Sequence, residues 1–210
     1  IRAGPCPTHD KIGSLSAGQS KQFTGQVQSG CGYTWYSIDN GWVASDFVTV
    51  RGPVSSSQCT TRSYPLFKQC DAKWKNEALG TSTICSIGCL MSSVSMALNG
   101  LGKKINGETS NPSTLNKYLK NNGGYQGNLF VWGAVKSLGL NYQGKITSKS
   151  AIADNICANN VVILNVNNGG HWVLATGVSG DKSTFYVNDP GANKSSFSAS
   201  EVSQAAVYTV

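Results

Sequence analysis

The sequence predicts two domains: a small all-β barrel over residues 1–52, then an α+β domain over residues 64–210 with helices first and an antiparallel sheet second. The first observation is a series of short alternating segments broken by glycine, confined to the first fifty residues. The second is a stretch rich in proline, glycine and serine, which predicts a linker over residues 53–63. The third is helical spacing followed by strand patterns in the remainder of the chain.

In the first domain, the segments 11–15, 33–38 and 41–48 alternate polar and apolar residues, and glycine separates them. Such short strands are typical of a small antiparallel barrel. A domain of this size cannot bury five rings, so we expect two or three aromatic side chains to form its core and the others to line a groove. The five aromatic residues are Tyr33, Trp35, Tyr36, Trp42 and Phe47.

In the second domain, apolar residues at helical spacing follow Gly88 directly and predict a helix that starts at Cys89. Pairs of glycine or asparagine end three further predicted helices, and apolar runs bounded by turn residues predict strands. Ser198 and Glu201 form a capping-box pattern for a short helix before the last strand. The further helices are predicted at 112–121, 128–138 and 149–159, and the strands at 161–166, 171–178, 184–188 and 206–210.

Cys89 is the candidate nucleophile. The macrodipole and the unpaired amides at a helix start stabilise a thiolate, which is the nucleophilic form of cysteine. The chain has seven cysteines, and an odd number in an oxidising compartment leaves one thiol unpaired. We expect Cys6 to pair with Cys31 in the barrel and Cys89 to be the free thiol, while the pairing among positions 59, 70, 85 and 157 stays open.

His171 is the candidate base for this thiol. The chain has two histidines, and we interpret the other, His9, as a solvated loop residue. His171 begins the predicted strand 171–178, and a hairpin folded about Gly180 places position 171 opposite position 189. Asp189 at that position would accept a hydrogen bond from the imidazole and fix its tautomer.

Gln69 lies twenty residues before the thiol, and its side-chain amide would supply an oxyanion donor beside the Cys89 backbone amide. The order of these residues resembles that of papain-fold cysteine peptidases of the double-glycine leader-peptidase type, and the resemblance covers residues 64–191. It implies a two-lobed papain-like fold in which Cys89 is the nucleophile, His171 the base, Asp189 its orienter and Gln69 the oxyanion residue. The matching positions are Gln69, Asp71, Trp74, Gly88-Cys89, Gly170-His171-Trp172-Val173 and Asn188-Asp189-Pro190-Gly191.

The first domain is similar to bacterial-type SH3 domains over almost the whole of residues 1–50. The opening Arg2-Ala3-Gly4-Pro5 and the closing Gly41-Trp42-Val43 carry the resemblance. Such modules usually attach a hydrolase to a cell wall. The resemblance therefore implies binding of bacterial peptidoglycan, in its peptide portion, with Tyr33, Trp35, Tyr36 and Trp42 as the wall-binding residues.

The net charge of +7 lies almost entirely in the second domain, because residues 1–52 hold four basic and three acidic side chains and residues 53–210 hold thirteen and seven. A basic enzyme is attracted to anionic surfaces such as bacterial walls. The lysines are scattered singly apart from Lys103-Lys104, so we expect no nucleic-acid partner. We also expect no cofactor and no metal site, since the two histidines lie far apart and the cysteines are oxidised.

We interpret the chain as a secreted, monomeric enzyme that hydrolyses bacterial peptidoglycan. It begins with isoleucine and shows no signal sequence, as a processed secretory protein would, and no apolar run approaches membrane-spanning length. The sequon at Asn193 would carry a glycan only in a eukaryotic host.

Two alternatives stay open. The layout also resembles secreted fungal muramidases with an SH3-like cell-wall-binding domain, which implies cleavage of the glycan strand by two carboxyl groups, for which Asp71 and Asp189 are the candidates. Either residue also has an ordinary structural interpretation, Asp71 as a helix cap and Asp189 as a turn former. The other alternative is a wall-binding protein without catalytic activity, which a disulfide at Cys89 would favour.

Overall fold

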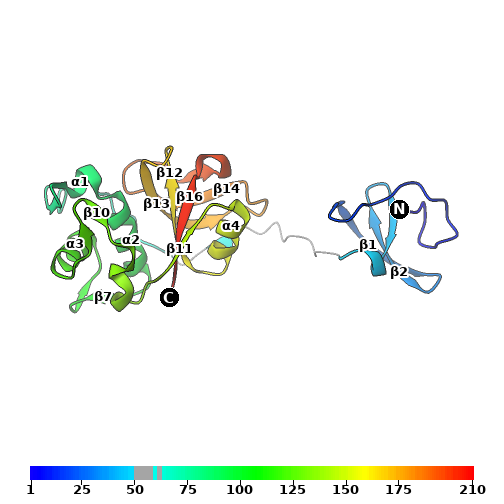
Figure 1. Ribbon diagram of the computed structural model, residues 1–210, viewed down its shortest axis with the longest axis horizontal. Helices are drawn as coiled ribbons and strands as arrows, with labels where there is room; N and C mark the ends of the chain where they lie inside the picture. Colours follow the sequence, from blue (N-terminus) through cyan, green and yellow to red (C-terminus); the bar gives the residue numbers. More distant parts are fainter. Residues whose placement is uncertain (50–58, 61–62) are drawn as a thin grey trace. The chain divides into compact units, whose positions relative to one another are not determined.

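The computed structural model describes residues 1–49, 59–60 and 63–210. The chain divides into two compact units, Ile1–Ser55 and Ser56–Val210, each of which is described by itself (Figure 1). Of the linker that we expected over residues 53–63, residues 53–58 and 61–62 lie outside the described residues.

The first unit contains a three-stranded antiparallel sheet. The N-terminal segment joins this sheet at Arg2, which forms β-bridges with both Lys11 and Trp42. The predicted disulfide between Cys6 and Cys31 is confirmed. The elements are β1 (Phe23–Gly30), β2 (Tyr33–Ile38), β3 (Gly41–Ala44) and the 3-10 helix η1 (Ser45–Phe47).

Two segments of the first unit differ from the prediction. The strand expected at 11–15 is a single bridge at Lys11, and β1, an eight-residue strand of mostly polar sequence that was not expected, pairs with β2. The register of β1 shifts between Phe23 and Val27, so its inward-facing residues do not alternate with a period of two. A bulge of this kind hides a strand from pattern-based prediction.

The second unit is built on a seven-stranded sheet in the order β11-β16-β12-β13-β14-β15, with β4 also paired with β13. Every pairing in it is antiparallel. The predicted antiparallel sheet, with mixed helices, is therefore present. The strands are β4 (Cys59–Thr60), β11 (Asn141–Ile146), β12 (Val161–Val166), β13 (His171–Val178), β14 (Thr184–Asn188), β15 (Ser196–Ser198) and β16 (Gln204–Thr209).

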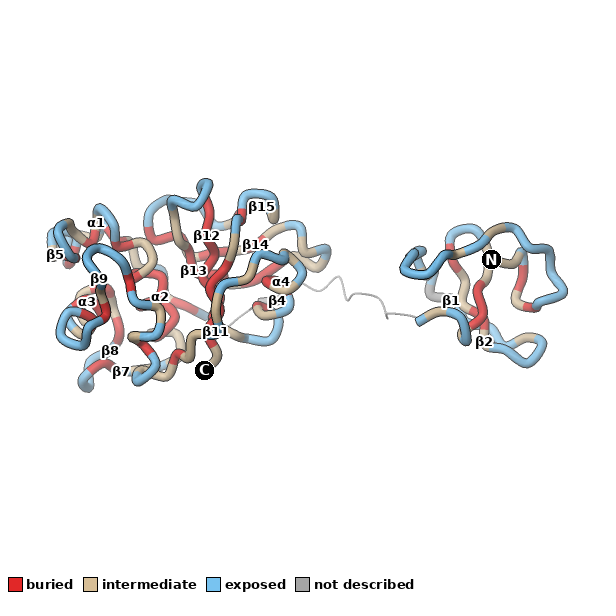
Figure 2. Tube along the Cα trace, viewed as in Figure 1, coloured by how far each residue is buried: buried red, intermediate tan, exposed pale blue. Residues whose placement is uncertain are grey.

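Helices cover both faces of this sheet. β12 is buried along its whole length, because Ile163 packs into one core with residues of α2 and α3 while Leu164 packs into a second core with residues of α4. A strand buried on both faces has the continuous apolar sequence seen here. Figure 1 shows α1, α2 and α3 grouped on one side of the strands and α4 on the other, and Figure 2 shows the buried residues concentrated along α2 and the central strands.

The helices α1, α3 and α4 begin where a side chain accepts a hydrogen bond from one of the first amides. Thr83 caps α1 (Ile84–Ile87), and Ser148 caps α4 (Lys149–Cys157). Asn111 forms a capping box with Thr114 at the start of α3 (Pro112–Asn121), and α2 (Cys89–Gly100) begins without any side-chain cap. The capping box predicted for Ser198 and Glu201 is present at the 3-10 helix η3 (Ala199–Glu201).

The prediction of a helix at 128–138 is wrong for the first residues of that range. Gly127, with φ of 60°, turns the chain between β9 (Tyr125–Gln126) and β10 (Leu129–Phe130), and only the 3-10 helix η2 (Trp132–Leu138) follows. The strand β11 was not expected either, because a register shift between Tyr142 and Gly144 breaks its alternation. The remaining short hairpins are β5 (Ala78–Leu79) with β6 (Ser82–Thr83), and β7 (Lys104–Ile105) with β8 (Glu108–Thr109).

Disulfides fix two segments of the second unit. Cys59 bonds Cys157 at the end of α4, so that β4, which we expected to lie within the linker, is part of the sheet. Cys70 bonds Cys85 in α1. Three disulfides are typical of extracellular proteins. No helix in the described part of the chain is long and apolar enough to span a membrane.

Candidate active site

Cys89 occupies the first position of α2 and carries the free thiol. The other six cysteines form the three disulfides, as the odd count indicated. Gly88 makes the junction between α1 and α2 possible, because a Cβ there would lie 2.3 Å from the backbone oxygen of Ile84. The backbone amide of Cys89 opens the helix and therefore has no intrahelical acceptor.

His171 begins β13, after a tight turn that Asn165 holds in place. The buried amide of Asn165 donates hydrogen bonds to the backbone oxygens of Gly169 and His171, at 3.0 and 3.1 Å. Sequence reasoning missed Asn165, although a single amide inside the apolar run of β12 is the signal that would have found it. His9, by contrast, is exposed in the first unit, as expected.

Asp189 lies 2.7 Å from His171, measured from Oδ1 to Nε2. The same oxygen accepts the backbone amides of Gly191 and Ala192, at 2.8 and 2.9 Å. Burial alone would raise the pKa of Asp189, but the hydrogen bonds from His171 and from the two amides outweigh it and hold the pKa below its ordinary value. Asp189 is therefore an ionised acceptor aimed at the imidazole.

The predicted pairing of positions 171 and 189 is wrong by two residues. Leu174 pairs with Asn188, and a bulge follows in β13, so the strand positions opposite His171 lie beyond Asp189. A shift of two residues leaves every side chain on its original face, so Asp189 is a diagonal neighbour of His171 and still reaches it. Gly191 also comes close, because a Cβ there would lie 2.9 Å from His171 Cε1.

The imidazole joins Asp189 to the thiol. The hydrogen bond to Asp189, and after it the interaction with the Cys89 side chain, raise the pKa of His171 to about 9 against the opposing effect of burial. Since Nε2 faces Asp189, Nδ1 is the ring nitrogen left for the thiol. The arrangement favours an imidazolium at neutral pH, which is the partner that a thiolate needs.

Gln69 is buried against the segment that follows β14. Its backbone amide donates to the oxygen of Pro190 at 2.9 Å, and its side-chain Nε2 donates to the backbone oxygen of Cys85. A side-chain amide nitrogen carries two hydrogens, so one donor of Gln69 is left for a ligand. The disulfide between Cys70 and Cys85 ties this residue to the helical segment that precedes Cys89.

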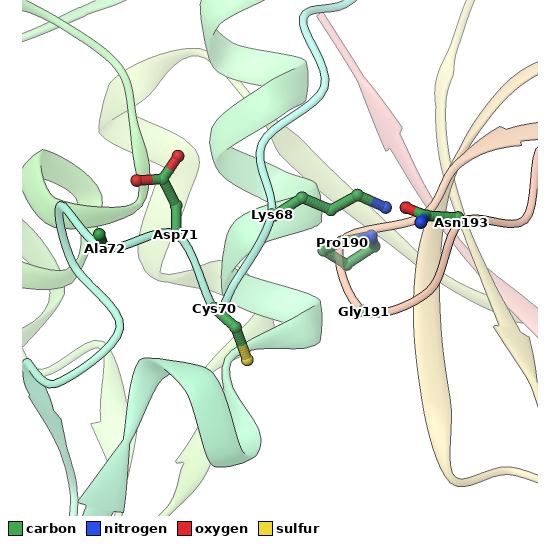
Figure 3. A pocket seen from close by; sticks show the side chains of 7 residues that line it. All are labelled: Lys68, Cys70, Asp71, Ala72, Pro190, Gly191 and Asn193. Carbon is green, nitrogen blue, oxygen red and sulfur yellow. The ribbon is translucent and has the colours of Figure 1, made fainter.

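Asp71 does not join the catalytic group. It lines a hollow of about 590 Å³ beside Lys68, Gly191 and Asn193 (Figure 3), and its Oδ1 accepts the amide of Lys73 at 2.9 Å. The glycosidase alternative needs a carboxylic acid with a raised pKa that faces the sugar. Asp189 is only 2% exposed and its pKa is lowered, so the two aspartates do not fit that chemistry.

The aromatic candidates of the first unit separate into core and surface. Trp35 is 4% exposed and donates its indole N–H to the backbone oxygen of Gly30, so most of its ring belongs to the core. Tyr33 and Trp42, with the edge of Trp35, line an open hollow of about 610 Å³, and Tyr36 lines another of about 620 Å³. Phe47 borders both hollows and is 82% exposed.

Within residues 1–49, 59–60 and 63–210, no three histidine, cysteine or acidic side chains are grouped as a metal site requires. A family model described as "Peptidase_C39 like family" matches residues 61–209, a range that contains Gln69, Cys89, His171 and Asp189. No curated protein and no solved structure gave a significant match to the chain.

Proposed function

The chain belongs to the peptidase C39-like family, and from this premise we propose that it is a cysteine peptidase that hydrolyses amide bonds of bacterial peptidoglycan. The observation that carries the chemistry is the hydrogen bond between Asp189 and His171, together with the free thiol of Cys89, which interacts with the same imidazole and raises its pKa. A disulfide at Cys89 would have favoured a non-catalytic wall-binding protein, and Cys89 is free.

The reaction begins when the Cys89 sulfur attacks the carbonyl carbon of a peptide bond. The electrons of the carbonyl move onto its oxygen, next to the backbone amide of Cys89 and the second N–H of Gln69. As the intermediate collapses, the C–N bond breaks and His171 donates its proton to the leaving amine. Asp189 stabilises the imidazolium until this proton is transferred. The product of this step is a thioester.

Hydrolysis of the thioester completes the cycle. The neutral imidazole removes a proton from a water molecule, whose oxygen attacks the acyl carbon. The C–S bond then breaks and the proton returns to the Cys89–His171 pair. The Asn165 amide supports both steps because it holds the backbone on which His171 is mounted.

Three features support peptidoglycan as the substrate. The net charge of +7 attracts the protein to anionic walls. The three disulfides fit an enzyme that works outside the cell, where peptidoglycan is accessible. The first unit presents aromatic hollows suited to a wall ligand.

We expect digestion of purified peptidoglycan by the protein to create new amino termini and no new reducing sugar ends. The reason is that a thiolate attacks a carbonyl, whereas glycan cleavage needs a carboxylic acid at the sugar. Mass spectrometry of the soluble fragments distinguishes the two products, with the Cys89→Ala variant as the blank. New reducing ends without new amino termini would make the muramidase alternative correct.

We propose that the first unit is the SH3-like wall-binding module, with Tyr33 and Trp42 as its contact residues. Replacing both with alanine should weaken binding of the full chain to insoluble peptidoglycan by roughly tenfold or more, since exposed aromatic anchors dominate such interfaces. A sedimentation assay in the Cys89→Ala background measures binding without digestion. Val27→Ala is the matched control, because Val27 is 56% exposed and lines neither hollow. Equal binding by all three proteins would exclude this surface.

A further inference from the structure

Lys68 reaches from the segment before Gln69 to the loop that carries Asp189. Its ammonium donates hydrogen bonds to the backbone oxygens of Asp189, at 2.8 Å, and of Ala192. The two segments are 121 residues apart in the sequence. Figure 3 shows the Lys68 side chain extended toward Pro190 and Asn193, while Asp71 lies on the opposite side of the hollow.

The loop is held from two sides by opposite charges. On the inside, the Asp189 carboxylate accepts the amides of Gly191 and Ala192. On the outside, the Lys68 ammonium donates to the backbone oxygens of Asp189 and Ala192, and the Gln69 backbone amide donates to the backbone oxygen of Pro190. The peptide group between Pro190 and Gly191 thus accepts a hydrogen bond from the Gln69 amide at its oxygen and donates one to the Asp189 carboxylate from its N–H. The dipole of this peptide group is aligned with both hydrogen bonds.

Lys68 is not an ordinary surface lysine. Its side chain is half-buried, and none of the ion pairs among the described residues involves it. Its backbone is fixed as well, because the indole N–H of Trp74 donates to the Lys68 oxygen at 2.8 Å. An ammonium held by backbone oxygens alone, on a fixed backbone, places the loop at a defined distance from Gln69.

The 189–192 loop, which Lys68 holds, lies against the imidazole of His171. Gly191 comes so close to His171 that a Cβ would be 2.9 Å from Cε1, and Asp189 in the same loop orients Nε2. A displacement of about 1 Å in a supporting residue can cost about 100-fold in rate. Loosening of this loop would therefore disturb the His171–Asp189 contact directly.

We propose that Lys68 is a positioning residue for the peptidase reaction: its ammonium holds the 189–192 loop so that Asp189 keeps His171 in the orientation that serves Cys89. This inference rests on the proposed cysteine-peptidase mechanism and not on the identity of the substrate. Lys68 itself touches neither the nucleophile nor the imidazole in any contact described above.

The test compares Lys68→Met with Lys68→Arg in the full chain. Methionine keeps the length of the side chain but has no donor, whereas arginine keeps the charge and the donors. The first readout is the rate at which iodoacetamide alkylates Cys89 at neutral pH, since this rate follows the thiolate paired with the imidazolium and needs no substrate. The second is kcat and KM for peptidoglycan fragments, and thermal melting monitors folding.

We expect Lys68→Met to slow alkylation by about tenfold and to lower kcat by 10- to 100-fold with KM within about threefold. Lys68→Arg should recover at least part of both losses. Lys75→Met is the matched control, because Lys75 is an exposed lysine of the same segment, and it should behave as the wild type. If Lys68→Met does not fold, Lys68→Gln replaces it, since a shorter neutral donor should give an intermediate loss.

The proposal is overturned if Lys68→Met alkylates and turns over at the rate of Lys75→Met, or if arginine and methionine reduce both rates equally. It is also overturned if the loss follows the melting temperature alone and disappears well below it. A wild-type protein that is alkylated at Cys89 but does not digest peptidoglycan would contradict the substrate proposal, while the comparison of alkylation rates would still decide the role of Lys68.

Discussion

Replacing Cys89 with alanine should reduce hydrolysis of bacterial walls by a factor of about 10⁴ or more, which makes it the largest effect expected in this chain. The sulfur of Cys89 is the attacking atom, and the other six cysteines are held in disulfides. The thioester cannot form without it. Release of soluble fragments from purified peptidoglycan, followed over time, measures the loss.

Two comparisons make this result specific. Alkylation of the wild type with iodoacetamide should remove activity to the same extent, because Cys89 carries the free thiol. Cys89→Ser should fold as the wild type does and remain nearly inactive, since a hydroxyl beside an imidazolium is a much weaker nucleophile than a thiolate. Full lytic activity in Cys89→Ala would end the peptidase hypothesis and favour carboxylate chemistry.

The residues of the site were predictable where their signal is local. Cys89 follows a glycine at the start of a helical pattern, and the odd number of cysteines indicated that one thiol is free. The His171–Asp189 pair followed from hairpin geometry even though the register was wrong by two, because side chains alternate with a period of two. A register error of an even number of residues keeps each side chain on the same face of the sheet. The contact between His171 and Asp189 depends on that face.

Other residues could not be predicted because their roles depend on contacts between distant segments. Lys68 binds oxygens more than 120 positions away, and no local pattern distinguishes it from the neighbouring lysines. Trp35 and Trp42 are not distinguished by any local sequence pattern, yet the fold of the small sheet buries Trp35 and leaves Trp42 partly exposed. In β1 and β11, bulges interrupt the alternation that pattern analysis requires.

The fold of the second unit was easier to predict than that of the first for a physical reason. Strands such as β12 and helices such as α2 are buried over most of their length, so their apolar residues repeat with a clear period. The first unit has few buried residues, and its N-terminal segment joins the sheet through isolated bridges at Arg2. A small core specifies its strands only weakly in the sequence.

The second large effect is expected from Asp189→Asn, which should lower kcat by about 10³- to 10⁴-fold. The carboxylate of Asp189 accepts a hydrogen bond from the Nε2–H of His171, which leaves Nδ1 for the thiol. An amide at this position no longer stabilises the imidazolium and can present an N–H to the ring, which favours the wrong tautomer. Because the alanine variant would leave a cavity at a buried site, asparagine is the more informative substitution.

The pH dependence of this variant separates a catalytic effect from a structural one. In the wild type the hydrogen bond that His171 donates to Asp189 is the largest cause that raises the pKa of His171 to about 9, so activity should persist through neutral pH and fall as the pH rises through about 9. In Asp189→Asn the carboxylate that raises the His171 pKa is gone, so the pH at which activity falls should move down toward the ordinary histidine pKa of about 6.5. The pH profile of kcat/KM measures both limbs in the free enzyme.

The stability of the folded protein should also decrease at alkaline pH, because folding raises the pKa of His171. A group whose pKa is raised by folding stabilises the native state most at pH values below its unfolded pKa, and this contribution is lost as the pH rises through the folded value. The melting temperature of the wild type should therefore fall between pH 6.5 and 9 by more than that of Asp189→Asn. If the two proteins show the same alkaline limb and the same decline in melting temperature, Asp189 does not control the protonation of His171, and the imidazolium must be stabilised from another side of the ring.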